Sequence, residues 1–282
     1  MATPDPTRIA GNISALNALN ALMDVNNRLA IAQTRLATGR RINSAAEDPA
    51  GLTIATKLDA RSQGLKVALD ALGDAKNVLS VAEGGLREIN DILVKIRNKA
   101  EAAVSDVIGN EERNAIYNDI AGFVAEIDDI VGDTTFNGTP LIGSGSTASN
   151  PLEFLADADG NTITFSLGTS HTAAALGITI SGSAQVGSSG SAAAYLALVE
   201  AAITTVSRSL GTVGSLSARL DFKMENLTIA HANTEATFNR IMNANMAEEQ
   251  VTATKYAILQ QTATAMLAQA NAQPQFVLSL FR

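Results

Sequence analysis

One leucine recurs every seven residues through six consecutive repeats. The positions are Leu58, Leu65, Leu72, Leu79, Leu86 and Leu93, and three residues after each stand Arg61, Ala68, Ala75, Ala82, Ile89 and Ile96. A strict seven-residue apolar repeat makes a helix pack along one seam, with a preference for a left-handed supercoil. Asp48 suits the N-cap, and Pro49 suits the first helical position. The pattern predicts a helix over about 49–107, roughly 90 Å long at 1.5 Å per residue.

Other parts of the chain show weaker helical periodicity. Apolar residues at steps of three and four predict helices over 9–36, with a start near Thr7, over about 110–131, and over a long C-terminal stretch from Leu216 to Leu267. The middle differs, because short alternating runs at 152–155 and 162–167 flank the turn-forming segment 157–161. These runs predict a β-hairpin, and a further short run at 178–180 extends the predicted β insert.

These patterns together predict a mainly α fold, an elongated antiparallel helical rod or coiled coil with a small β-hairpin insert at the outer tip. We expect three parts. Residues 1–46 with 245–282 form a terminal coiled coil, residues 47–141 with 191–244 form a helical rod, and residues 142–190 form a surface-exposed β and loop insert.

Charge is distributed unevenly along the chain. Residues 114–207 contain no Lys or Arg and nine Asp or Glu, whereas the flanking segments are nearly balanced. An anionic stretch of this length argues against a nucleic acid partner, because little is present to neutralise phosphate. No run of about 18 uncharged apolar residues predicts membrane insertion, and no secretory signal peptide is visible at the N-terminus.

The terminal segments contain few large apolar side chains for their length. Burying those of residues 9–38 offsets only part of the conformational entropy lost when the segment is ordered. The tail from residue 244 is rich in Ala, Asn, Gln and Thr and is no better supplied. We therefore expect both ends to be disordered in the monomer and to fold against each other and against neighbouring copies.

Two distant segments resemble the bacterial flagellins. The segment from Leu36 to Leu52, LATGRRINSAAEDPAGL, resembles the N-terminal flagellin signature. The segments ILQQTATAMLAQAN at 258–271 and PQFVLSLFR at 274–282 are similar to the flagellin C-terminus. The family motif positions are Arg41, Ile42, Asn43, Asp48, Phe136, Asn137 and Gly138, the last three resembling the turn that closes the N-terminal half of the helical core.

The resemblance implies a structural subunit that polymerises into the extracellular flagellar filament for swimming motility. It implies export in unfolded form by the flagellar type III system, and folding of the termini on assembly. The implied partners are other copies of the chain, the hook–filament junction protein, the filament cap and an export chaperone at the C-terminal region. The alternative within the same class is that the chain is itself the hook–filament junction protein, which has similar ends.

The assembly interface is predicted from the apolar positions of the two ends. The residues are Leu16, Leu19, Leu22, Leu29, Leu36, Leu259, Met266, Leu267, Leu278 and Phe281. Arg41, Asn43 and Asp48 are expected to shape the connection between inner and outer layers, with an Arg–Asp ion pair as a hypothesis. Ser and Thr residues between Ser144 and Ser191 are either O-glycosylated or simply solvated, and an intact mass distinguishes the two.

The resemblance also implies a segment, about 89–101, that an innate immune receptor contacts in some flagellins. Arg97 matches the family residue, and Lys95 keeps a positive charge. Outside this segment, Asp119 stands where a Glu is typical. Lys99 stands where receptor-binding members carry an apolar residue, so we expect weakened or absent receptor activation.

No catalytic, cofactor or metal site is predicted, and the chain is not expected to be an enzyme. The segment 157–161 lacks the glycine and acidic residues that a calcium loop needs at its sixth and twelfth positions, so a hairpin turn is the better interpretation. The two histidines, His171 and His231, are far apart in sequence, and cysteine is absent. No nucleophile–base pair stands at a plausible spacing.

Overall fold

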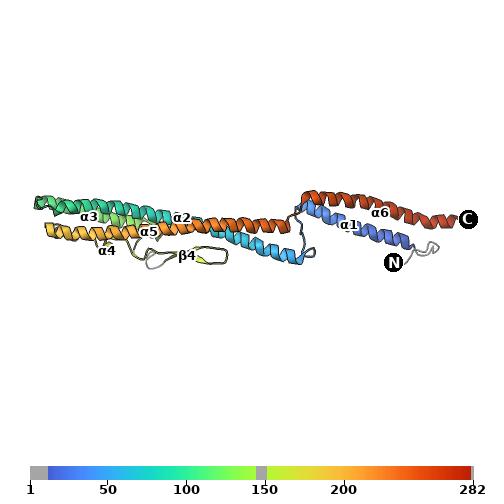
Figure 1. The fold of residues 1–282 in the computed structure, drawn as a ribbon, viewed down its shortest axis with the longest axis horizontal. Helices are drawn as coiled ribbons and strands as arrows, with labels where there is room; N and C mark the ends of the chain where they lie inside the picture. Colours follow the sequence, from blue (N-terminus) through green and yellow to red (C-terminus); the bar gives the residue numbers. More distant parts are fainter. Residues whose placement is uncertain (1–11, 144–150, 281–282) are drawn as a thin grey trace. The chain divides into compact units, whose positions relative to one another are not determined.

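The structure, a computed structural model, describes residues 12–143 and 151–280, with the side chains of 273–280 outside the description. Its elements in chain order are α1 (Ile13–Thr38), α2 (Pro49–Val104), α3 (Asn110–Asp133), β1 (Thr135–Phe136), β2 (Thr139–Pro140), β3 (Leu152–Leu155), β4 (Thr162–Phe165), α4 (Ala173–Leu176), the 3-10 helix η1 (Ser183–Gln185), α5 (Ser189–Met242) and α6 (Met246–Leu280). The predicted mainly α class is confirmed (Figure 1).

The chain divides into two compact units. Unit 1 contains residues 1–60 and 233–282, and unit 2 contains residues 61–232. The long helices α2 and α5 contribute residues to both.

The core of unit 2 follows the predicted heptad seam of α2. The heptad leucines Leu65, Leu72, Leu79, Leu86 and Leu93 are at most 3% exposed, and Ala68, Ala75, Ala82, Ile89 and Ile96 are completely buried. Ile120 and Ile127 of α3 join this cluster, as do Val199, Val206 and Leu220 of α5. The predicted seam is packed from Leu65 to Ile96, whereas its first pair lies outside the core, with Leu58 half-buried and Arg61 exposed. The sequence pattern predicts the C-terminal partner helix only from Leu216. In the structure, the buried residues of α5 begin at Ala192.

Most helix boundaries lie close to those predicted. Asp48 caps α2, because its Oδ1 accepts a hydrogen bond from the Gly51 amide at 2.8 Å. This helix ends at Val104 rather than 107. Helix α1 is described from Ile13, where the Asn12 side chain accepts a hydrogen bond from the Ala15 amide. The predicted start near Thr7 lies outside the described residues.

A buried arginine stabilises the connection between α2 and α3. Arg113 is 6% exposed. Its guanidinium donates to the carbonyl oxygens of Ala103, Ser105 and Ile108. The last carbonyls of a helix have no partner within the helix, so this cation satisfies that of Ala103 near the end of α2 and interacts favourably with the helix dipole. Its other two bonds hold the loop that follows.

Two short antiparallel hairpins follow α3. In the first, Phe136 pairs with Thr139, and the two turn residues Asn137 and Gly138 both have positive φ, as a two-residue type I′ turn requires. In the second, Leu152 to Leu155 pairs with Thr162 to Phe165, as predicted. Its tip is closed by Asp157, which accepts hydrogen bonds from the amides of Asp159 and Asn161. These bonds, and above all the one from the Asn161 side chain, lower the pKa of Asp157.

The middle segment contributes to the core of unit 2. Phe165, His171 and Ile178 are fully buried. The hairpin tip approaches α2 closely, since a Cβ added at Gly64 would lie 3.0 Å from the Ala158 Cβ. The β3–β4 hairpin therefore packs along α2 and α5 within this unit, and does not lie beside the α2–α3 connection. Its apolar alternation faces those helices.

The run at 178–180 is not a strand, which corrects the prediction made for it. Ile178 is buried, and its carbonyl accepts a hydrogen bond from the Tyr195 hydroxyl at 2.8 Å. Burial raises the pKa of this tyrosine to about 12. The backbone of this segment is fixed by side-chain contacts with α5 rather than by a ladder of strand hydrogen bonds.

By length and composition alone, α5 contains one window apolar enough to cross a membrane, with a mean hydropathy of 1.3. Its buried apolar positions, from Ala192 to Leu227, line the core of unit 2.

Candidate functional site

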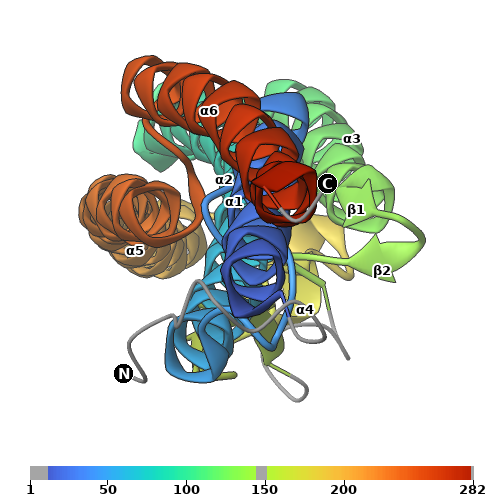
Figure 2. The same cartoon turned by 90° about the vertical axis from the view of Figure 1, so that its right-hand side faces the viewer.

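Unit 1 contains the segments that the sequence marked for assembly. Helices α1 and α6 run side by side (Figure 2). They are antiparallel, because Asn12 donates a hydrogen bond to the Ala270 carbonyl at one end, and Arg35 contacts Glu249 at the other. Gln260 and Asn26 are joined by a side-chain hydrogen bond of 2.7 Å between these ends.

The apolar core between α1 and α6 is small. Its buried members are Leu29, Ala32 and Ala253. Leu36, Tyr256 and Ala257 are partly buried against them. A packed core residue usually touches many others, so the three side chains buried here among the described residues, two of them alanines, provide little hydrophobic stabilisation.

The predicted assembly residues occupy different environments. Leu29 is buried, and Leu22, Leu36 and Leu267 are half-buried. Leu16, Leu19, Leu259 and Met266 are 57%, 40%, 39% and 61% exposed. The side chain of Leu278 and the whole of Phe281 lie outside the described residues. The structure therefore brings Leu29 and Leu36 into the α1–α6 contact and leaves four of the predicted residues facing outward.

Further apolar side chains of both helices are exposed and were not selected from the sequence. They are Ile13, Met23, Ile31, Met246, Val251 and Ile258, all more than 40% exposed. An apolar surface that extends along both helices of a pair is typical of an interaction surface.

The two connectors of unit 1 are joined through their backbones. One connector links α1 to α2, and the other links α5 to α6. The Arg41 amide donates to the Met242 carbonyl at 2.6 Å, and the Ala244 amide donates to the Gly39 carbonyl at 2.9 Å. Gly39 has a φ of 70°, the left-handed conformation that favours glycine after a helix.

The family motif residues build the first connector. Ile42 is 3% exposed and lies in a small cluster with Ala55 and Met242. The Asn43 side chain donates to the Arg40 carbonyl at 3.0 Å. A Cβ added at Gly51 would lie 2.3 Å from an Asp48 carboxylate oxygen, so only glycine permits this approach. The motif therefore fixes the shape of the turn that enters α2.

Arg41 acts mainly through a backbone contact. Its Nε donates to the Ile241 carbonyl at 3.0 Å. Its guanidinium and the Asp48 carboxylate are 3.9 Å apart, and both side chains are substantially exposed. The hypothesised Arg–Asp pair is therefore present only as a long contact, which contributes little at a solvated surface.

Arg35 was not selected from the sequence. Its guanidinium contacts Glu249 at 3.1 Å and Glu47 at 3.3 Å, and the arginine side chain is 28% exposed. One arginine thus joins α1, the first connector and α6. The contact could not be found from spacing, because its partners are distant in sequence.

Unit 2 brings together a buried histidine and serine that the sequence placed far apart. The distance from His171 Nε2 to Ser209 Oγ is 2.8 Å. Both residues are buried, at 0% and 5% exposure, and His171 Nδ1 has no hydrogen-bond partner among the described residues. The two residues lie 38 positions apart in the sequence, so their spacing did not reveal this contact. The pair is closed to solvent and lacks a third group that would orient the histidine, so it has the character of a core contact.

Three of the residues predicted to face an innate immune receptor form surface ion pairs. Lys99 contacts Asp119 at 2.6 Å, and Arg97 contacts Glu200 at 3.5 Å. Lys95 is exposed. No group of metal-ligating side chains occurs in the part of the chain that the structure describes.

A scan of family models matches both ends of the chain. The bacterial flagellin N-terminal helical region matches residues 9–147, and the bacterial flagellin C-terminal helical region matches residues 196–281. A flagellin crystal structure from Bacillus cereus has a TM-score of 0.48 and 24% identity, covering 55% of this chain and 86% of that one.

Full-length relatives extend the match across the middle segment. Flagellin from Bacillus subtilis (strain 168) is 31% identical and aligns over 98% of this chain and 100% of its own length. The flagellar filament 33 kDa core protein of Treponema phagedenis is 31% identical, with 96% and 98% covered. Because two family models and full-length relatives agree, the chain belongs to the bacterial flagellin family.

Proposed function

We infer that the chain is a structural subunit of the bacterial flagellar filament, located outside the cell, and not an enzyme. The observation that carries this inference is membership of the flagellin family across both terminal regions. The full-length relatives are named as flagellins and filament core proteins, which supports the filament subunit over the hook–filament junction protein.

We propose that unit 1 forms the contact between copies inside the filament. Its support is the exposed apolar surface of α1 and α6, combined with a cluster between these two helices that has only three buried members among the described residues. Neighbouring copies would bury Leu16, Leu19 and Met266, and each fully buried side chain of this size contributes roughly 1.5–3 kcal/mol. Assembly would therefore supply the hydrophobic stabilisation that one copy lacks.

This proposal includes folding of the ends during assembly. An isolated pair of helices with few buried side chains opens easily, because the free energy of local unfolding follows the local burial. Contacts with neighbouring copies then stabilise the helical form by mass action. Backbone amides of α1 and α6 should exchange with solvent much faster than those of α2 in the monomer, and should become protected in the polymer.

The test is elongation of filament fragments by purified monomer. Electron microscopy and sedimentation should show growth from the fragment ends, and hydrogen exchange should show protection of α1 and α6 only after growth. Monomer that never elongates the fragments would contradict the filament function. Amides of α1 and α6 already as protected in the monomer as those of α2 would contradict folding on assembly.

The finer partners remain proposals that the resemblance supports. The proposed partners are an export chaperone at the C-terminal region, the filament cap and the hook–filament junction protein. The proposed secretion route is export in unfolded form by the flagellar type III system. The three-part division at 46/47, 141/142, 190/191 and 244/245 is likewise proposed for the assembled subunit. Weak innate immune receptor activation is supported by the Lys99–Asp119 ion pair, which keeps a charge where an apolar contact is needed.

A further inference from the structure

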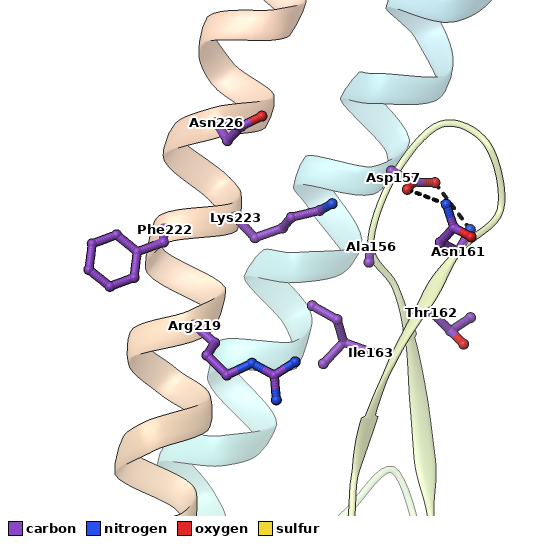
Figure 3. A pocket seen from close by; sticks show the side chains of 9 residues that line it. All are labelled: Ala156, Asp157, Asn161, Thr162, Ile163, Arg219, Phe222, Lys223 and Asn226. Carbon is purple, nitrogen blue, oxygen red and sulfur yellow. Dashed lines mark hydrogen bonds between the residues drawn. The ribbon is translucent and has the colours of Figure 1, made fainter.

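A cleft of about 630 Å³ lies between the β3–β4 hairpin and α5 in unit 2. Ala156, Asp157, Asn161, Thr162 and Ile163 line it on the hairpin side, and Arg219, Phe222, Lys223 and Asn226 line it on α5. Figure 3 shows the side chains of Arg219 and Lys223 extending from α5 to the side where the hairpin lies.

The charge of this cleft is positive. Its charged side chains are Asp157, Arg219 and Lys223. The Asp157 carboxylate is occupied within the hairpin by Asn161, whose side-chain nitrogen lies 2.6 Å away. Arg219 has no hydrogen bond or ion pair among the described residues, so its guanidinium remains available to an external carboxylate.

The rim of the cleft carries an exposed aromatic side chain. Phe222 is 73% exposed. In Figure 3 its ring points away from the hairpin and contacts none of the residues drawn there. Aromatic and arginine side chains are enriched at the centres of protein interfaces, where they contribute much of the binding energy. The ring adds contact area that a small anion would leave unused.

A complementary face lies on α3 of the same chain. Glu126, Asp129 and Asp133 are exposed and recur at helical spacing, and they form no ion pair among the described residues. The small residues Gly122 and Ala125 lie on the same side of the helix and are also exposed. The stretch 114–207 contains no basic residue that could neutralise this face locally.

We propose that the cleft of one copy receives the acidic face of α3 from a neighbouring copy in the filament. This inference rests on the proposed polymerisation. The two surfaces are different parts of the chain, so the contact is heterologous and leaves an unused cleft at one end and an unused α3 face at the other. A contact of this kind extends an open array.

Charge reversal tests the contact. The first variant carries Arg219→Glu and Lys223→Glu, and the second carries Glu126→Lys and Asp129→Lys. Each should raise the monomer concentration needed for elongation of filament fragments by at least about tenfold, because like charges would then face each other. Combining all four substitutions restores opposite charges and should return this concentration to within about threefold of the unsubstituted chain.

A matched control separates the contact from net charge. Arg219→Glu and Lys223→Glu are combined with Glu101→Lys and Glu111→Lys, which restore the same net charge at exposed positions away from the acidic face. This control should elongate as poorly as the first variant. Thermal unfolding confirms that each monomer is folded, and Arg219→Glu alone serves if the Lys223 change disturbs the hairpin. Rescue by the control, or wild-type elongation by Arg219→Glu, would overturn the proposal.

Cross-linking provides a readout that does not depend on elongation. The natural chain contains no cysteine. Copies with Phe222→Cys are mixed with copies carrying Ala125→Cys and oxidised with copper–phenanthroline. The mixture should form dimers at least about tenfold faster than Phe222→Cys mixed with Lys66→Cys. Equal rates would overturn the contact, even where filaments form. If the cross-link forms fast but the unsubstituted chain does not elongate filament fragments, the contact stands and the proposed filament function is contradicted.

Discussion

Unit 1 and unit 2 are both built from long helices with apolar repeats, yet only unit 2 closes its own core. In unit 2, α3, α5 and the middle segment pack around the α2 seam, and leucines such as Leu72 and Leu86 are completely buried. In unit 1, two terminal helices bury Leu29, Ala32 and Ala253 and expose many larger apolar residues. The comparison teaches that the number of helices around a seam decides whether a single copy can bury the apolar side chains of that seam.

Leu29→Asp should have the largest effect, on assembly. A carboxylate at this buried position removes the main apolar contact of α1 with α6, and a buried unpaired charge is strongly unfavourable. Seeded elongation should fall by on the order of a hundredfold or more, since about 2–3 kcal/mol of contact free energy is lost per copy. Leu29→Met, which conserves volume, should elongate normally. Filaments from Leu29→Asp at the natural rate would remove the proposed role of unit 1.

Leu79→Ala should have the largest effect on the stability of unit 2. Leu79 is 1% exposed, and truncation of such a leucine destabilises by about 2–5 kcal/mol. Leu16→Ala, at a position that is 57% exposed, should change the monomer by within about 0.5 kcal/mol. Urea unfolding of both monomers, followed by circular dichroism, measures the difference. Equal losses would mean that the two units are stabilised alike.

Arg113→Ala should destabilise unit 2 by about 1.5–3 kcal/mol, because three carbonyl oxygens at the α2–α3 connection lose a charged donor. The matched control is Arg87→Ala, whose side chain is 71% exposed and, within the described ranges, pairs only with Glu83 four residues earlier. Urea unfolding should show a change for Arg87→Ala that is several times smaller. A comparable change in the two variants would contradict the capping role.

His171 should give a smaller, pH-dependent effect. Burial lowers its pKa below the ordinary value of 6.5, so the unfolded chain binds a proton more readily than the folded chain. The fold therefore favours neutral His171. The stability that depends on this neutral form is complete above about pH 7 and is lost as the pH falls below 6.5. His171→Gln should flatten the decline between pH 7 and pH 5, as measured by urea unfolding. An unchanged pH profile would show that His171 is as accessible as in the unfolded chain.

Lys76→Ala should have the smallest effect. Lys76 and Asp221 are 2.6 Å apart, but their side chains are 49% and 53% exposed. Solvent screening limits such pairs to about 1 kcal/mol or less, and added salt reduces them further. In low salt the variant should unfold at a slightly lower temperature than the unsubstituted chain. In high salt the two unfolding temperatures should agree. A loss comparable to that of Leu79→Ala would mean that surface charge, not the seam, holds unit 2 together.

Regular repeats made the helices predictable. The heptad from Leu58 to Leu93 marked α2 because each buried leucine has the same local spacing. Asp48 and Pro49 marked its start, since capping depends on neighbouring residues alone. The β3–β4 hairpin was predicted for the same reason, because its alternation and its turn residues are contiguous.

Long-range contacts were harder to predict. Nothing near Arg113 in the sequence reveals that its guanidinium reaches the end of α2, because the contact depends on how the connection folds. Arg35 was missed for a similar reason, with Glu249 lying 214 positions away. The buried contact between His171 and Ser209 arises because the middle segment packs on α5, whereas its polar composition suggested a solvated insert.

The antiparallel pairing of α1 with α6 joins the first described helix to the last. Arg35 meets Glu249, and Asn12 meets Ala270, so unit 1 needs both extremities at once. A polypeptide that stops early would retain most of unit 2 but leave α1 without its companion. Only chains that extend through α6 could then form the terminal helix pair. Truncated chains would lack this pair, and the growing polymer would exclude them.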